Sequence, residues 1–410
     1  MSETHGGGTR DHRFRCFLCG HAADEFGYDC ARCGGPLLLE PDAVSASDLE
    51  PAARGTRGPW RFPALLPRTR HRVSLGEGDT PLVPLTFVGA GGRPVFAKLE
   101  SLNPSLSFKD RAMAIGASAA ADLGARGLVV ASTGNAAVSA ATYAAAAGLA
   151  CRVLVGSESR AAKKLDACRA LGAEVHEIEG DYSAAYARAG ALEGDGWMNV
   201  STTYRNPFLA EGYRSIAFEL LEQLGRTPSA VIVPIGAGPL LRGIERGFAD
   251  AVAVGRATHQ PALVGVQAAR VSPIHAAWLR RHPADGVDRA PRAPASEPGG
   301  TIATAIADRL TGYESHGDIT IEAVERTGGT VVAIGEADIV EATRQLAAAG
   351  IWVEASAATA LAALRADRAY SDATRVESGD DQNAPVVLML TGHGAKAPAL
   401  PPVGTPGTTS

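Results

Sequence analysis

Short apolar runs alternate with segments of helical periodicity along most of the chain. Such apolar runs predict strands at 82–85, 94–100, 127–131, 150–155, 174–178, 230–234, 263–267, 330–334 and 385–390. Small-residue or amphipathic segments predict helices at 110–123, 138–147, 161–171, 182–192 and 336–349. The run at 230–234 is apolar on both faces, which is typical of a central strand in a parallel sheet. This order of strands and helices predicts an α/β fold.

Changes in composition divide the chain into five parts. Residues 1–13 are polar and Gly-rich and predict a disordered tail. Residues 14–40 carry paired cysteines, and residues 41–75 are rich in Pro and Arg, which indicates a linker that lies against the main domain. The α/β pattern fills residues 76–400, and the Pro/Gly/Thr-rich end, 401–410, predicts a second disordered tail.

Length and charge exclude several classes of protein. The 410 residues are 46% hydrophobic, which is enough to bury a large core in two or three domains. A net charge of −5 gives no basic footprint, so we expect no nucleic-acid partner and no anionic membrane surface. No apolar run approaches the ~18 residues of a membrane span, and the polar N-terminus lacks the core of a signal peptide. We therefore expect a cytoplasmic protein.

Four cysteines form two pairs with metal-ligand spacing. Cys16 and Cys19 are followed by Gly20, and Cys30 and Cys33 are followed by glycines. Two such pairs supply four thiolates for a tetrahedral zinc ion, and a fully thiolate-ligated zinc is structural. Four free thiols, two disulfides, or a vestigial ribbon without metal are the alternatives. Because a long linker separates these cysteines from the main domain, we expect removal of the metal to loosen the N-terminal segment and to leave the binding of any cofactor largely intact.

A lysine stands at the predicted start of the helix 110–123. Pro104 biases Asn103 away from helical geometry, and Ser107 or Asp110 could cap the helix. The helix dipole disfavours a cation at this end, and Lys109 would escape that penalty by forming an imine with an aldehyde. The local alternative is a solvated lysine in a charged Lys-Asp-Arg trio.

Two loops between a strand and a helix could bind anions. The first, residues 132–135, is Ser-Thr-Gly-Asn, and the second, residues 236–240, is Gly-Ala-Gly-Pro-Leu. Backbone N–H groups at such turns suit a carboxylate or a phosphate, although Pro239 lacks an N–H. An ordinary capped helix and a plain tight turn are the alternatives. Residues 281–300, rich in Arg, Pro and Gly, predict a flexible excursion.

The stretch 103–111, Asn-Pro-x-x-Ser-Phe-Lys-Asp-Arg, resembles the Schiff-base lysine motif of threonine synthases and their relatives. These are fold-type II (tryptophan synthase β-like) pyridoxal-phosphate enzymes, many of which carry an N-terminal zinc ribbon. Here Ser105 and Leu106 replace the family's Thr-Gly. The resemblance runs with gaps from Gly76 to Lys396, and it includes the segments 76–82, 206–220, 301–306 and 391–396.

The resemblance implies a fold, a cofactor and site residues. The fold would be two three-layer α/β domains with parallel sheets, a smaller mobile part roughly at 110–220, and the small zinc ribbon. Lys109 would be catalytic, and we expect a homodimer. The implied cofactor ligands are Lys109, Asn135, Gly236, Ala237, Gly238, Leu240 and Thr391. The implied ligands of the substrate carboxylate are Ser132, Thr133 and Gly134. A neutral Thr391 at the ring nitrogen favours elimination and replacement over transamination, and His393 is expected to shape its loop.

The implied activity is conversion of O-phosphohomoserine to threonine and phosphate, a lyase reaction on a small amino-acid substrate. The family commonly carries an arginine for the substrate phosphate where this chain has Leu209. Arg111, Arg205 or Arg214 could replace it. Leu106 also narrows the space beside Lys109. A threonine or serine ammonia-lyase, or a cysteate-synthase-like enzyme, is the alternative. A more distant one is a non-catalytic zinc-ribbon protein on the same scaffold.

Overall fold

The computed structural model describes residues 12–40, 42, 44–50, 56–90, 92–157, 162–201, 204–283, 300–366 and 383–397. The predicted tail 401–410 and nearly all of the tail 1–13 lie outside these residues, as does most of the excursion at 281–300. In the described part of the chain, no helix combines the length and the apolar composition that a membrane crossing requires.

The largest sheet has the strand order β12-β11-β10-β13-β5-β4. Its strands are parallel except at the edge, where β4 pairs with β5 in the antiparallel sense. The central strands β10 and β13 are buried on both faces, as the apolar run at 230–234 predicts. The bounds are β4 (Leu82–Pro84), β5 (Val95–Lys98), β10 (Ala230–Pro234), β11 (Ala262–Ala268), β12 (Thr330–Ile334) and β13 (Val386–Met389).

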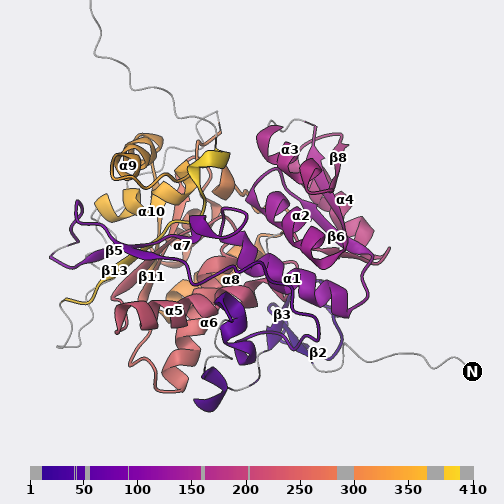
Figure 1. Cartoon of the computed structure of the whole chain (residues 1–410), viewed down its shortest axis with the longest axis horizontal. Helices are drawn as coiled ribbons and strands as arrows, with labels where there is room; N and C mark the ends of the chain where they lie inside the picture. Colours follow the sequence, from indigo (N-terminus) through magenta and orange to yellow (C-terminus); the bar gives the residue numbers. More distant parts are fainter. Residues whose placement is uncertain are drawn as a thin grey trace, which may run out of the picture.

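A second sheet, with the order β8-β7-β6-β9, is parallel throughout. Its strands are β6 (Gly127–Ala131), β7 (Ala150–Gly156), β8 (Glu174–Ile178) and β9 (Trp197–Asn199). The helices that belong to it form a separate group from those around the larger sheet (Figure 1). They are α2 (Asn135–Ala147), α3 (Ala162–Ala170) and α4 (Tyr182–Glu193).

The remaining helices surround the larger sheet or connect the two. They are α1 (Lys109–Asp122), α5 (Ser215–Leu224), α6 (Pro239–Ala253), α7 (Pro273–Arg281), α8 (Ser315–Arg326), α9 (Glu336–Ala348) and α10 (Ala355–Arg365). Helix α1 packs against α2 on one side and against the 3-10 helix η5 (Leu209–Tyr213) on another. Two α/β units with parallel sheets confirm the predicted fold class.

The N-terminal cysteines lie at the end of the first strand and in the turns of a small antiparallel sheet, β2-β1-β3. Its strands are β1 (Arg13–Cys16), β2 (Ala22–Ala23) and β3 (Leu37–Glu40). We call residues 13–40 the ribbon. The segment that follows leads back to the core, where Phe62 is fully buried against Phe218 of α5, with ring centroids 5.1 Å apart.

Candidate active site

Lys109 is the first residue of α1 and is half-buried. The chain turns tightly before it, because the N–H of Leu106 donates to the carbonyl of Asn103 at 2.7 Å. The hydroxyl of Ser107 then accepts a hydrogen bond from the N–H of Lys109 at 3.1 Å. This satisfies one of the N–H groups of the first turn that have no partner within the helix. Leu106 has φ of 63°, the left-handed region that glycine favours. This is the position at which the related motif has Gly.

The two charged neighbours of Lys109 anchor the helix. The buried carboxylate of Asp110 accepts from the N–H of Ser105 at 2.6 Å and from the hydroxyl of Ser139, on α2, at 2.5 Å. Burial raises the pKa of Asp110 to about 6, although these hydrogen bonds oppose the shift. Asp110 therefore ties the start of α1 both to its own turn and to α2.

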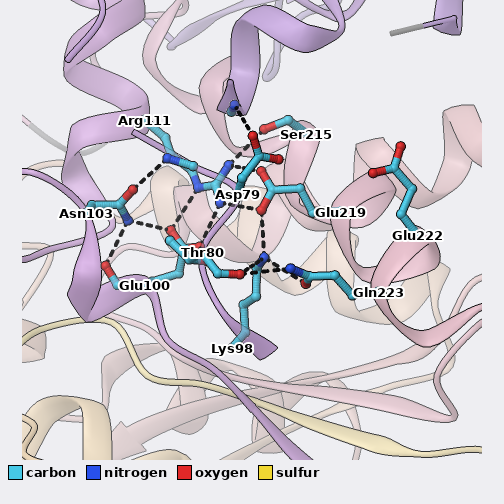
Figure 2. A network of polar contacts seen from close by, with 12 residues as sticks. Asp79, Thr80, Lys98, Glu100, Asn103, Arg111, Ser215, Glu219, Glu222 and Gln223 are labelled. Atoms are coloured by element: carbon cyan, nitrogen blue, oxygen red, sulfur yellow. Dashed lines mark hydrogen bonds and ion pairs between the residues drawn. The ribbon is translucent and has the colours of Figure 1, made fainter. Parts of the chain in front are cut away.

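Arg111 lies at the centre of a buried ionic network (Figure 2). Its guanidinium donates to Glu100 through Nε and Nη2, both at 2.8 Å, and to Glu219 through Nη1 at 2.6 Å. Lys98 Nζ also donates to Glu219, at 2.6 Å. Burial alone would raise the pKa of Glu219, but Arg111 and Lys98 hold it far below its usual range. The network fixes α1 between β5 and α5.

The amine of Lys109 faces a carboxylate from a distant segment. Burial lowers the pKa of Lys109 to about 7, and the charge of Asp308 opposes that shift. Asp308 accepts from Tyr313 OH at 2.7 Å, and a Cβ placed on Gly236 would lie 3.5 Å from its Cβ. Lys109, Asp308 and the loop after β10 therefore meet in one place.

The segment after β13 closes the other side of Lys109. The N–H of Phe108 donates to the carbonyl of Thr391 at 3.1 Å, and Ser107 pairs with Gly392 in an isolated bridge. Thr391 is therefore held beside the start of α1. The ring of His393 accepts from the N–H of Ala395 at 3.0 Å, which is a role in shaping this loop.

Asn135, at the start of α2, is linked to the segment after β13 by the carboxylate of Glu354. Its Nδ2 donates to Glu354 at 2.7 Å, and Glu354 also accepts from Lys164 Nζ at 2.7 Å. A Cβ added to Gly392 would lie 2.6 Å from Glu354 and 3.0 Å from Asn135 Nδ2, so a side chain there would displace one of these two groups. The buried Oδ1 of Asn135 has no hydrogen-bond partner among the described residues.

The two predicted anion loops have the expected positions between strand and helix. Ser132, Thr133 and Gly134 are half-buried between β6 and α2, and the Ser132 hydroxyl accepts from the N–H of Gly134 at 3.0 Å. Their backbone N–H groups lie at the N-terminus of α2, where the helix dipole favours an anion.

The second loop joins β10 to α6. Gly238 has φ of 101°, and a Cβ there would lie 2.2 Å from Thr320 Oγ1, so the loop requires glycine. Gly236 is half-buried, whereas Ala237 and Leu240 are buried. Thr320 of α8 fixes the loop, because its hydroxyl donates to the carbonyl of Ala237 at 2.5 Å.

These residues fit pyridoxal phosphate. The site combines four features: a half-buried amine, a glycine loop at a helix N-terminus, a buried amide oxygen without a described partner, and a threonine beside the amine. Contacts that involve Asp308, Gly236, Gly392 and Glu354 bring these features together. Sequence reasoning missed Asp308, Glu354 and Lys164. The Glu before a small-residue helix was visible at 354–358, but no local pattern pointed to Asp308 or Lys164.

The candidate replacements for the missing phosphate-binding arginine are all occupied by carboxylates. Arg111 serves the buried network, Arg214 binds Asp250 at 2.5 Å, and Arg205 binds both Asp29 and Glu193 at 2.7 Å. Leu209 is buried, and a Cβ on Gly116 would lie 2.8 Å from it. Gly116 is about two turns beyond Lys109 along α1, so Leu209 packs into the core and contributes no polar group.

The thiols of Cys16, Cys19, Cys30 and Cys33 converge, with their sulfurs within 4.8 Å of one another. Cys16 Sγ lies 3.4 Å from Cys33 Sγ, and Cys19 Sγ lies 3.8 Å from Cys30 Sγ. A tetrahedral zinc with bonds of ~2.3 Å separates its sulfur ligands by ~3.8 Å. The four side chains therefore fit a zinc ion.

The ribbon packs directly on the segment that precedes η5. Phe26 stacks on Phe208 with centroids 5.1 Å apart and planes 10° apart, and Phe14 meets the same ring edge-on at 5.7 Å. Tyr28 OH accepts from the N–H of Asn199 at 2.8 Å. The expectation that a linker isolates the ribbon from the main domain is therefore wrong.

Comparisons with known proteins agree on one family. The model of the family described as "Pyridoxal-phosphate dependent enzyme" matches residues 73–392. The threonine synthase of Methanocaldococcus jannaschii is 33% identical over 396 residues, which is 94% of this chain and 93% of the relative. The threonine synthase of Mycobacterium tuberculosis is 30% identical, over 84% of this chain and 91% of the relative.

Solved structures show the same fold at lower identity. A fungal L-serine ammonia-lyase from Rhizomucor miehei has a TM-score of 0.61 and 21% identity, over 77% of this chain and 93% of that one. Maize serine racemase has a TM-score of 0.60 and 20% identity, over 77% of this chain and 89% of that one.

Proposed function

The chain belongs to the pyridoxal-phosphate dependent enzyme family, and from that premise we propose that it converts O-phosphohomoserine to threonine and phosphate. Curated threonine synthases match it at 30–33% identity over most of both chains, which makes it a pyridoxal-phosphate-dependent lyase of their group. The observation that carries the proposal is the half-buried, low-pKa amine of Lys109, which faces Asp308 beside Thr391 and the glycine loop.

Each site residue has a role in this proposal. Lys109 is the group that attaches the cofactor and moves the α-proton at Nζ, since an amine with a pKa of about 7 is both a base and an acid near neutral pH. Gly236, Ala237, Gly238 and Leu240 provide backbone for the cofactor phosphate. Asn135 and Thr391 orient the ring. Pyridoxal phosphate, when bound, supplies an electrophilic carbon and an electron-accepting ring.

Substrate binding uses the other loop. Ser132, Thr133 and Gly134 would hold the substrate carboxylate at the N-terminus of α2. Glu354, fixed by Lys164, keeps Asn135 in place. The smaller part of the catalytic region 76–400, roughly residues 110–220, would close over the substrate and exclude water.

The same proposal extends to the metal, the assembly and the compartment. We assign a structural zinc to the four ribbon cysteines, because their sulfurs approach tetrahedral spacing. We further propose a cytoplasmic homodimer without a nucleic-acid partner, in line with the net charge of −5. A zinc-ribbon protein that has lost catalysis is disfavoured by the retained set of Lys109, Asn135 and Thr391.

One observation favours a second candidate, an ammonia-lyase acting on threonine or serine. Leu209 lies in the core, and the three candidate arginines are engaged by carboxylates, so the substrate phosphate lacks its expected ligand. A phosphate dianion in a closed site needs charge-assisted donors. A carboxylate beside Lys109, Asp308, suits a hydroxyl better than a phosphate.

Incubation of the purified enzyme with O-phosphohomoserine tests the proposal. Equal release of phosphate and threonine supports the synthase, and the Lys109→Ala variant should release neither. If the enzyme does not turn over O-phosphohomoserine but forms 2-oxobutanoate and ammonia from threonine, the assignment moves to the ammonia-lyase.

A further inference from the structure

We propose that a cleft between the ribbon and helices α6 and α8 binds a small organic anion. The cleft has a volume of about 430 Å³, and of its lining residues only Cys16, a ligand of the proposed zinc, has a role in the proposed function. This volume is within the range of small-molecule sites, about 300–1,000 Å³. The inference does not depend on which substrate the enzyme takes.

Two arginines of α6 provide the binding groups. Arg242 and Arg246 are one helical turn apart, so their side chains leave the same face of α6, and both line the cleft. Arg242 is half-buried, and its guanidinium has no hydrogen bond or ion pair within the described part of the chain. Like charges at this spacing destabilise a helix, and an anion held between them would remove the repulsion.

Arg246 is only partly satisfied. Its Nη1 donates to Glu211 and, at 3.4 Å, to the carbonyl of Leu39, but its buried Nη2 has no partner among the described residues. Burial lowers the pKa of Arg246 to about 10, with Glu211 opposing and Arg242 adding to the shift. A buried guanidinium N–H without an acceptor is costly, so a movement of the Arg246 side chain that brings Nη2 to an anion in the cleft would be favourable.

The other walls of the cleft define what the anion carries. Arg326 is already paired with Glu245 at 3.0 Å and lies 3.7 Å from Glu322, which also lines the cleft, and Arg15 is paired with Glu40, so neither arginine adds a free positive charge. The ribbon contributes apolar surface from Phe17, Leu38 and Leu39. A carboxylate or phosphate with an uncharged, partly apolar body therefore matches the cleft, with its charged end toward α6.

The two arginines connect the cleft to the glycine loop on one side and to the ribbon on the other. The N–H of Arg242 donates to the carbonyl of Gly238, at 3.2 Å, in the glycine loop that begins α6. The carbonyl of Leu39 on β3 accepts from Arg246. An anion in the cleft would thus fix the ribbon against the helix that begins at the cofactor loop.

The test uses the full chain loaded with pyridoxal phosphate and zinc, and two probes: inorganic phosphate and butanoate. Calorimetric titration measures binding to the parent, to Arg242→Ala and to Arg242→Glu. Arg344→Ala, on α9, is the matched control because it removes one guanidinium elsewhere. Hydrogen exchange of residues 13–40 with and without probe locates the binding.

We expect Arg242→Ala to weaken binding of at least one probe by about tenfold, equivalent to ~1.4 kcal/mol, and Arg242→Glu to weaken it further. Arg344→Ala should bind as the parent does, and the probe should slow exchange in the ribbon. Equal affinity of Arg242→Ala and the parent would overturn the site. So would the absence of measurable binding of either probe to the parent at about 10 mM.

Discussion

At the residue scale, the ionisation of Lys109 is the property that the proposed chemistry needs most. Its pKa is lowered to about 7 by burial, whereas an ordinary lysine titrates near ~10.4. The neutral amine, which is the reactive form, therefore grows as pH rises through 7. In cofactor-free protein, labelling by a small amine reagent should show a midpoint for Lys109 near pH 7, measured by peptide mass spectrometry.

The exposed Lys163 on α3 is the internal reference in the same digest. A Lys109 profile that coincides with that of Lys163 would mean that the side chain is solvated. The local alternative of a lysine in a charged surface trio would then be correct after all.

Leu106 is a residue at which this chain departs from the related motif, and the backbone shows the consequence. A φ of 63° at a residue with a branched side chain costs about 1–2 kcal/mol. We expect Leu106→Gly to raise the free energy of unfolding by up to about 1 kcal/mol, since greater freedom of glycine in the unfolded chain offsets part of the gain. Urea denaturation measures this. Marked destabilisation would show that packing by the Leu106 side chain outweighs the strain.

The site residues predicted from the sequence share one trait: each belongs to a contiguous motif. Lys109, the glycines of 236–238 and Thr391 stand in short stretches whose spacing indicates a turn at a strand or helix end. Asp308 and Lys164 act across the fold, and each lies in a stretch without such a pattern. Their positions beside Lys109 and Glu354 depend on how two distant segments pack, which local spacing does not encode.

At the element scale, the first turn of α1 depends on charges that come from other elements. Glu219 of α5 neutralises Arg111 and Lys98, all three within a fully buried network. Replacing Glu219 by Gln leaves two buried cations with Glu100 as the remaining carboxylate of the network. Such uncompensated burial typically costs about 3–5 kcal/mol. We expect Glu219→Gln to lower the free energy of unfolding by that amount in urea denaturation.

Glu222→Gln is the matched control, because Glu222 is an exposed glutamate on the same helix that lies apart from the network in Figure 2. It pairs with Arg61 instead. Its loss should cost less than about 1 kcal/mol. The low pKa of Glu219 also determines how the free energy of unfolding depends on pH. The stabilisation by Glu219 is complete above the ordinary pKa of a carboxyl group and is lost as pH falls toward the lowered pKa. Equal effects of the two variants would show that the network contributes little.

The elements most readily predicted were the buried parallel strands and the helices that follow them. The run at 230–234 became β10 with identical bounds, and the helix predicted at 110–123 became α1, Lys109–Asp122. Strand β9 and helices α5, α7 and α8 were not predicted from the sequence. Strand β9, Trp197–Asn199, is too short for a periodicity, and α8 carries His, Gly and Thr, which obscure a helical pattern.

At the scale of the whole molecule, the ribbon is part of the structure that supports α1. It holds Phe208 and Asn199, and η5 begins directly after Phe208. A Cβ on Gly212 of η5 would lie 2.2 Å from the carbonyl of Arg111, so η5 and α1 are in close contact. Packing therefore runs continuously from the cysteines to the helix that starts at Lys109.

Removal of the metal should consequently affect more than residues 13–40. Without zinc the four thiols lose their crosslink, and the stack of Phe26 on Phe208 loses its support. We expect chelation to accelerate hydrogen exchange in the ribbon and also in residues 197–213, and to lower the thermal midpoint. Added zinc should reverse both changes, which separates metal loss from irreversible damage. Faster exchange confined to residues 13–40 would contradict this coupling and restore the view of an independent ribbon.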